Sequence, residues 1–206
     1  MQRLWLYLFA LLLGPAGATA AAAEPNQQDD SALPKALPNS KMSLIDGIKQ
    51  AEKSGGAPIS AKFEFDDHGT LSLSVYTAEK GLSVALAQNV LKELSGSPEQ
   101  GWSPDVELFR DDEHVTRASE QLRLMSSSAY SLVEIVSKAQ ARAPGKAFSA
   151  APGLLRNVPI ALVELAIQDR VVRLVYDLKS GDLVGGTPPY GDVPGRRDAP
   201  LWEDRR

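Results

Sequence analysis

Two stretches of the chain have the spacing of apolar residues that is typical of an amphipathic helix. In residues 43–53, Ser43 precedes an apolar stripe made of Leu44, Ile45, Ile48 and Ala51. In residues 131–142, Ser131 precedes the same stripe, displaced by 88 positions and made of Leu132, Val133, Val136 and Ala139. Serine is a favourable N-cap, and an acidic residue that suits the helix dipole follows each serine by three positions. The pattern predicts two related helices.

Alternating apolar and polar residues after each predicted helix indicate a β-hairpin. The first hairpin covers residues 59–76, with its turn at residues 66–69, and the second covers residues 160–176. A shift of 100 positions places Tyr76 on Tyr176 and leaves 12 extra residues between helix and hairpin in the second copy. We therefore expect an α+β protein of two related units, each a helix packed on an antiparallel β-sheet.

The segments between the two copies have patterns of their own. Apolar residues in 85–96 fall on one helical stripe, which predicts a helix that ends at Gly96 and buries Val90, Leu91 and Leu94. Residues 101–109 indicate a turn and a short strand. Residues 111–125 predict a helix that starts with acidic residues and buries Val115, Ala118, Leu122 and Met125.

The two ends of the chain differ from its middle. Residues 1–23 combine Arg3, an apolar run too short to span a bilayer and a run of small residues, which is typical of a cleaved signal peptide; a retained membrane anchor is the alternative. Prolines and polar residues predict disorder at both ends of the folded part. The expected organisation is a signal peptide at 1–23, a disordered linker at 24–42, a first unit at 43–100, a connecting segment at 101–127, a second unit at 128–186 and a disordered tail at 187–206.

Composition and charge narrow the function classes. The 206 residues include 22 Lys and Arg and 26 Asp and Glu, a formal net charge of −4. Nucleic-acid binding depends on neutralising phosphates with basic residues, so we expect no nucleic-acid partner. The chain has no cysteine and must hold its fold by burial rather than by disulfides. Removal of a signal peptide would leave a periplasmic or secreted protein that does not span the membrane.

Few residues could carry chemistry. Imidazole and carboxylate groups are ordinary metal ligands, and two clusters contain both: Asp66, Asp67 and His68, and Asp111, Glu113 and His114. The same residues also suit a hairpin turn and a first helical turn. There is no cysteine or G-x-S-x-G nucleophile, and no glycine-bearing loop carries the lysine of a phosphate cradle. We expect no enzyme, no catalytic residue, no metal site and no cofactor.

Aromatic residues provide the candidates for partner binding. Tyr76 and Tyr176 end equivalent predicted strands, and Trp102 lies in a predicted loop. Tyrosine and tryptophan are common anchors at protein interfaces because they bury a large area and keep a polar group. The tyrosines could instead close each core at its rim. We take Tyr76, Trp102 and Tyr176 as candidate partner-binding residues.

The repeated unit resembles the PepSY domain, a small exported module first described in the propeptides of thermolysin-like peptidases. The resemblance rests on residues 43–81, on residues 131–146 and on residues 161–184, which end in "DLKSGDLV". It implies a non-enzymatic protein that inhibits or chaperones a peptidase, or that binds an envelope component. We therefore expect an exported, non-catalytic protein with a protein partner in the cell envelope. A small-ligand or metal-sensing envelope module is the alternative.

Overall fold

The computed structural model describes residues 32–187, except Gly55 and Asp169. The expected signal peptide at 1–23, the first part of the expected linker and nearly all of the expected tail lie outside the described residues. The first half of the described chain contains α1 (Ala32–Ala36), η1 (Leu37–Asn39), α2 (Leu44–Lys53), β1 (Ala57–Phe65), β2 (Leu71–Ala78), η2 (Leu86–Gln88), β3 (Leu91–Gly96), β4 (Asp105–Leu108) and α3 (Asp112–Ser126). The second half contains α4 (Leu132–Arg142), β5 (Lys146–Leu155), β6 (Val158–Ile167), β7 (Arg170–Asp177) and β8 (Leu183–Gly186).

All eight strands form one antiparallel sheet with the order β4-β3-β2-β1-β5-β6-β7-β8. The two halves of the sheet meet where β1 pairs with β5, at Ala61↔Ala150 and Lys62↔Ser149. The expected α+β class is confirmed. One continuous sheet serves both helices, because the first strand after α2 pairs with the first strand after α4.

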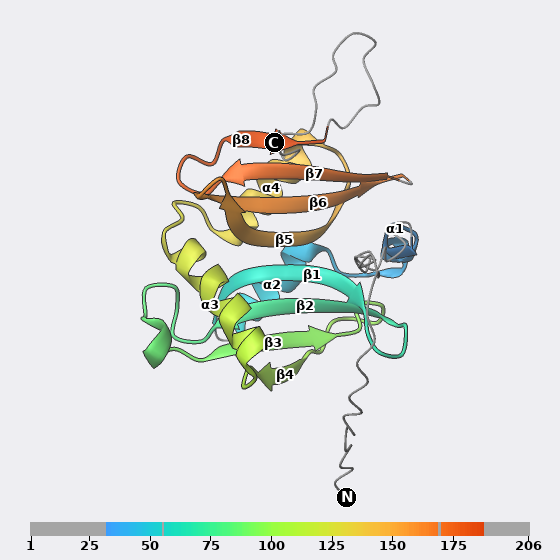
Figure 1. Ribbon diagram of the computed structural model, residues 1–206. Coiled ribbons are helices and arrows are strands. Elements are labelled where there is room, and N and C mark those ends of the chain that lie inside the picture. The colour runs from blue at the N-terminus through green and yellow to red at the C-terminus, as the bar shows by residue number, and fades with distance from the viewer. Residues whose placement is uncertain (1–31, 55, 169, 188–206) are drawn as a thin grey trace, which may run out of the picture.

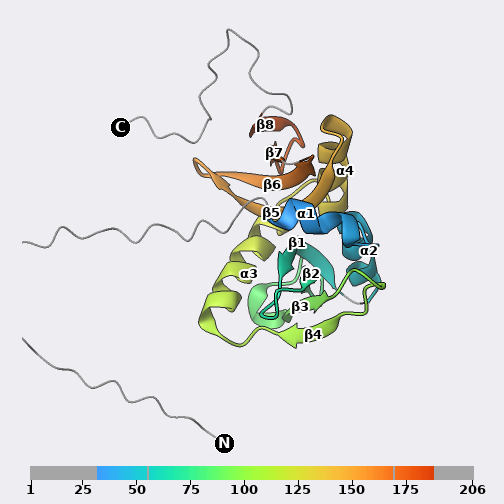
Figure 2. The same cartoon turned by 90° about the vertical axis from the view of Figure 1, so that its right-hand side faces the viewer.

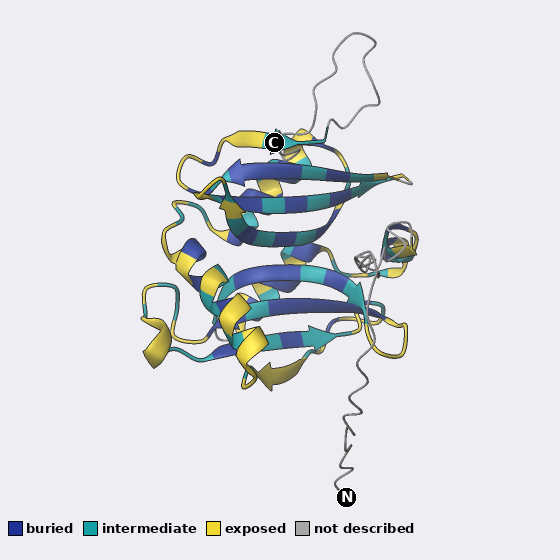
Figure 3. Ribbon diagram, viewed as in Figure 1, coloured by how far each residue is buried: buried dark blue, intermediate teal, exposed yellow. Residues whose placement is uncertain are grey.

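The helices lie on both faces of this sheet. Helices α2 and α4 pack against one face and against each other, whereas α3 crosses the opposite face over β1, β3 and β5 (Figures 1 and 2). We call the second side the α3 face. The main core lies under α2 and α4, and Figure 3 shows the buried residues along the middle strands. Its fully buried side chains include Leu44, Ile48, Leu73, Val75, Leu132, Ile135, Val136 and Leu165.

Both predicted N-caps of the core helices are confirmed. Ser43 Oγ accepts a hydrogen bond from the backbone N–H of Asp46 (3.1 Å), and Ser131 Oγ accepts one from Glu134 (3.2 Å). Each acid reaches back to the backbone N–H of its serine, which completes a capping box at both helices. Because the cap satisfies backbone donors that have no partner within the helix, it fixes where each helix begins.

Two sequence expectations are wrong, and a segment for which no element was predicted forms a strand. The helix expected at 85–96 is instead η2 and the strand β3, since Leu94 pairs with Val75 of β2 and is 2% exposed. The extra residues before the second hairpin form β5, a central strand. The expected linker at 24–42 is ordered in its described part, where α1 and η1 form and Leu37 is 2% exposed. In each case contact with distant parts of the sheet overrides the local pattern.

The connecting segment contains the expected short strand, β4, and the expected helix, α3. Ala118, Leu122 and Met125 of α3 are buried as predicted, and Val115 is half-buried. The two aligned tyrosines hold different places in the sheet. Tyr76 lies on the second strand after α2, and Tyr176 lies on the third strand after α4. The sequence alignment that pairs Tyr76 with Tyr176 therefore matches the second strand of one half with the third strand of the other half.

Candidate functional site

A groove follows the join between β1 and β5. It consists of two hollows that share Lys62 and Ser149: one of about 100 Å³ under α3 and one of about 480 Å³ beside α1. We call it the seam groove. The register explains the larger hollow, because β1 and β5 pair only at two positions and β1 then continues to Phe65 alongside β2.

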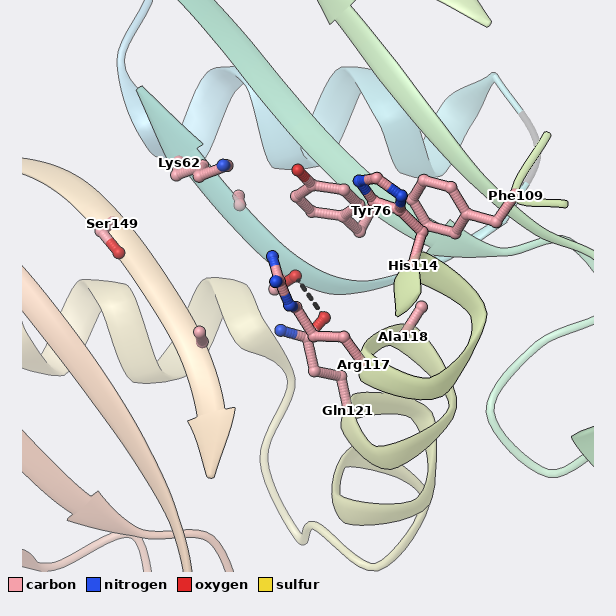
Figure 4. Close-up of a pocket in the computed structure, with 11 residues that line it drawn as sticks. Lys62, Tyr76, Phe109, His114, Arg117, Ala118, Gln121 and Ser149 are labelled. Carbon is pink, nitrogen blue, oxygen red and sulfur yellow. Dashed lines mark hydrogen bonds between the residues drawn. The ribbon is translucent and has the colours of Figure 1, made fainter. Parts of the chain in front are cut away.

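A row of aromatic rings forms one wall of the hollow under α3 (Figure 4). The Tyr76 and Phe109 ring centroids are 5.5 Å apart with planes tilted by 32°, and Phe109 stacks on His114 at 5.5 Å and 21°. Such offset ring pairs stabilise one another beyond their buried area. The three rings come from β2, from the loop after β4 and from α3, so the row exists only in the folded chain.

Hydrogen bonds at the start of α3 hold His114 in this row. Asp111 is the N-cap: its Oδ1 accepts the backbone N–H of His114 at 2.9 Å, and His114 Nδ1 lies 2.8 Å from both carboxylate oxygens. The backbone hydrogen bond from His114 is the main reason that the pKa of Asp111 lies below its ordinary value. The predicted first-turn role of these residues is thus confirmed.

Helix α3 is tied to the sheet by a polar contact inside the groove. Ser60 Oγ of β1 donates to Gln121 Oε1 of α3 at 2.7 Å, the dashed bond in Figure 4. Both side chains line the hollow, and Ala118 lies beside them on the helix. This contact sets the distance between α3 and β1 and so the width of the groove.

Charged side chains line the groove in pairs of opposite sign. Lys62 pairs with Glu64 on β1, and Glu64 Oε1 accepts a hydrogen bond from Ser74 Oγ at 2.9 Å. In the second half, Arg173 Nε donates to Glu164 Oε1 at 2.9 Å. Lys62 Nζ also lies 5.8 Å from the centre of the Tyr76 ring, within reach of a cation–π interaction. With Arg117, three cations and two carboxylates line the two hollows, among apolar groups.

Two half-buried titratable groups face each other across β2 and β3. Tyr76 is paired with Glu93 in the sheet. Burial and then the neighbouring Glu93 and Glu64 carboxylates raise the pKa of the Tyr76 hydroxyl, which therefore stays protonated and can donate a hydrogen bond. Burial is also the main reason that the pKa of Glu93 is raised.

The structure separates the three predicted partner-binding residues. Tyr76 is half-buried in the seam groove. Trp102 is 4% exposed, and its Nε1 donates to the Leu73 carbonyl at 2.9 Å. Tyr176 is also 4% exposed and belongs to the main core. Trp102 and Tyr176 are therefore corrected to core residues, because each covers apolar neighbours instead of offering its ring to a partner.

The residues that sequence reasoning missed come from α3 and from its N-terminal loop. Phe109, Arg117 and Gln121 line the groove but belong to no motif. A weak signal existed for Phe109, since a large aromatic residue lay between a predicted strand and a predicted helix. Nothing in the sequence indicated that α3 would cross β1 and β5.

Carboxylates of the two histidine clusters bind neighbouring protein groups. In the first, Asp66 Oδ1 accepts the backbone N–H groups of His68 (2.9 Å) and Thr70 (2.8 Å), which is the expected turn. In the second, Glu113 pairs with Arg117 at 2.9 Å. Among residues 32–187, apart from the two omitted positions, no three His, Asp or Glu side chains gather in a way that could hold a metal ion.

Comparison with known proteins assigns the chain to no family. Neither the models of protein families nor the curated proteins include a match. Among solved structures, the chain is similar to a candidate lipoprotein from Clostridium difficile 630, with 10% identity, a TM-score of 0.35 and coverage of 72% of this chain and 93% of that one. Within the described part of the chain, no helix is both long enough and apolar enough to cross a membrane.

Proposed function

We propose that this protein is an exported, non-catalytic binding protein that receives a segment of a partner protein in the seam groove. The single observation that carries the proposal is the groove itself, which aromatic and charged side chains line. Helix α3 covers only part of its face of the sheet (Figure 2). A partner segment would lie along the join between β1 and β5.

The lining suits a polypeptide better than a single small group. The Tyr76–Phe109–His114 row offers apolar contact area in the hollow under α3. The pairs Lys62–Glu64 and Glu164–Arg173 offer hydrogen-bond donors and acceptors in the hollow beside α1. Aromatic anchors beside hydrogen-bonding polar residues are common in protein interfaces. Tyr76 is the expected anchor because its ring is half-buried and its hydroxyl stays protonated.

Two features of the sequence support export and a protein partner. The charge, apolar run and small residues of positions 1–23 fit a signal peptide, which would place the protein in the periplasm or outside the cell. The resemblance to the PepSY domain supports a role in binding or inhibiting another protein, such as a peptidase. The helix followed by four antiparallel strands in each half is compatible with two related units.

Site-specific photocrosslinking in the cells that export the protein tests this proposal. A photoreactive amino acid at Arg117, whose side chain is 59% exposed at the groove, should give a discrete adduct with one partner protein. The matched control is the same group at Glu52, an exposed residue of α2 on the other face. Equal adducts from both positions, or none from Arg117, would reject the groove as the binding site.

Once the partner is identified, two tyrosine variants test the anchor. Tyr76→Ala should weaken the dissociation constant about tenfold or more, as truncation of a central aromatic anchor does. Tyr176→Phe should leave it unchanged, because Tyr176 lies in the core and only its hydroxyl is removed. Titration by calorimetry measures both, and circular dichroism checks that each variant is folded.

The larger hollow supports a second candidate, a small-ligand module. Its volume of about 480 Å³ lies within the usual range of ligand pockets, and Phe63, Phe65 and Phe148 provide apolar walls. Native mass spectrometry of protein purified from the cells that produce it would show a mass excess that disappears on denaturation. A mass equal to that of the polypeptide alone would reject this alternative.

A further inference from the structure

The strand β4 forms an open edge of the sheet. Among the residues that the structure describes it is the last strand of the order β4-β3-β2-β1, and it lies at the lower end of the sheet in Figure 1. All four of its residues are exposed. An edge strand presents backbone N–H and C=O groups that have no partner in the sheet, so it can serve as a template for a further strand.

The register shows which backbone groups of β4 point outward. The Phe109 N–H donates to the Leu91 carbonyl at 3.1 Å, in the same register that pairs β4 with β3. Hydrogen-bonded positions alternate in an antiparallel pair, so Glu107 directs its backbone groups toward β3. Val106 and Leu108 direct theirs away from β3. The open edge therefore offers one N–H and one C=O at each of these two residues.

The side chains of Val106 and Leu108 make one side of this edge apolar. They are 59% and 43% exposed. Val106 lies opposite Leu94, which belongs to the main core, so both side chains stand on the face of the sheet that α2 covers. Helix α2 packs over β1 and β2, further into the sheet. A strand added beside β4 would bury both apolar side chains.

The side chains of Asp105 and Glu107 make the other side of the edge acidic. They stand on the α3 face, because Glu107 lies opposite Glu93, which lies opposite Tyr76. Like charges directly opposite one another destabilise a sheet. Within the described ranges, neither Asp105 nor Glu107 forms an ion pair. A cation on a neighbouring strand would therefore balance a charge that the chain itself leaves uncompensated.

A second copy of this chain is a poor match for the edge. Two β4 strands paired antiparallel in one sheet would be related by a two-fold axis perpendicular to the sheet, so their α3 faces would lie on the same side. In the two registers with the longest overlap, an acid would then face an acid: Asp105 faces Glu107, or Glu107 faces its own copy. The acids that disfavour this pairing favour a basic partner strand.

We propose that β4 accepts an extended segment of another protein in which basic residues alternate with apolar ones, paired antiparallel to it. The segment would form hydrogen bonds with the backbone of Val106 and Leu108, and its apolar side chains would cover theirs. Its Lys or Arg side chains would stand beside Asp105 and Glu107. Opposite Glu107 the pair is not hydrogen-bonded, so the Cα atoms approach to about 4.5 Å and the charges come close together. In such complexes the backbone supplies affinity and the alternate side chains supply specificity. This inference does not depend on the seam groove.

Short peptides with blocked ends test the proposal. The isotope-labelled full chain is titrated with the peptide KVKVKV, and NMR measures the dissociation constant and the hydrogen exchange of the Val106 and Leu108 amides. We expect both amides to exchange at least about tenfold more slowly in the complex. The controls are EVEVEV, which reverses the charge, and KKKVVV, which keeps the composition but loses the alternation. Both should bind at least about tenfold more weakly than KVKVKV.

Two variants separate backbone pairing from charge. Val106→Pro removes an outward N–H without loss of a bond to β3, since proline is tolerated on an edge strand where its N–H would face solvent. This variant should abolish the protection of the Leu108 amide by KVKVKV. Glu107→Lys should weaken the binding of KVKVKV about tenfold and strengthen that of EVEVEV. Circular dichroism confirms that both variants are folded.

Three outcomes would overturn the proposal. Equal affinity for KVKVKV and KKKVVV would show that charge attracts the peptide without the addition of a strand. Slow exchange of the Val106 and Leu108 amides in the free protein, increasing with protein concentration, would show that a second copy occupies the edge. Unprotected amides at saturating KVKVKV, or a dissociation constant unchanged by Glu107→Lys, would exclude β4 as the binding site.

Discussion

Ala61 of β1 lies directly opposite Ala150 of β5, and both side chains are almost fully buried. This pair and its neighbour join the two halves of the sheet, while α2 and α4 pack against each other beneath the join. Small side chains at this point let the two helices approach the same stretch of sheet. The seam groove exists on the other face because the halves meet here and diverge beyond it.

The first prediction follows from this pair. Ala150→Leu should lower the free energy of unfolding by about 1–3 kcal/mol, because three additional carbons must fit a site that is 0% exposed. Urea unfolding followed by circular dichroism measures the change, and the unmodified protein should unfold in a single transition because the halves share one sheet. The matched control is Ala151→Leu, whose side chain points into the seam groove and should cost less. Two separate transitions in the unmodified protein would contradict the expectation.

Helix α2 lies so close to β2 that a methyl group on Gly47 would displace the Leu73 side chain. A Cβ on Gly47 would lie 2.4 Å from Leu73 Cδ2, and Leu73 is 0% exposed. Gly47→Ala should therefore destabilise the protein by about 1 kcal/mol or more, although alanine is the better helix former. Urea unfolding of Gly47→Ala, of Leu73→Ala and of the double variant completes a double-mutant cycle. If the penalty of Gly47→Ala persists when Leu73 is alanine, the close contact is not its cause.

The raised pKa of Glu93 predicts how stability changes with pH. Burial favours the neutral acid, so the folded-state pKa lies above the unfolded value near 4.5, and stability decreases as the pH rises through that interval. Glu93→Gln removes this cost. The variant should gain stability relative to the unmodified protein between pH 4 and pH 7, as measured by urea unfolding at both values. The prediction would be contradicted if the difference in unfolding free energy between the two proteins were the same at both pH values, or if the unmodified protein were the more stable one at pH 7.

The sequence predicted the elements whose signals are local. Ser43 and Ser131 cap α2 and α4 because each needs only an acid three positions later, within the same helical turn. The turn at Asp66 is likewise fixed by hydrogen bonds within five residues. The buried side of α3 followed from its own periodicity, and the short strand β4 from the turn that precedes it. These interactions form between neighbours in the chain, so their pattern can be read along it.

The tertiary structure alone decided how these elements combine. Leu91 and Leu94 have helical spacing but form a strand, because β2 offers them a paired edge and a buried face. Trp102 has the composition of a surface anchor but lies in the core, since the Leu73 carbonyl accepts its N–H. Tyr76, Phe109 and His114 meet only after three elements have packed together. Contacts between residues far apart in the chain set the seam groove, and no local pattern encodes such distances.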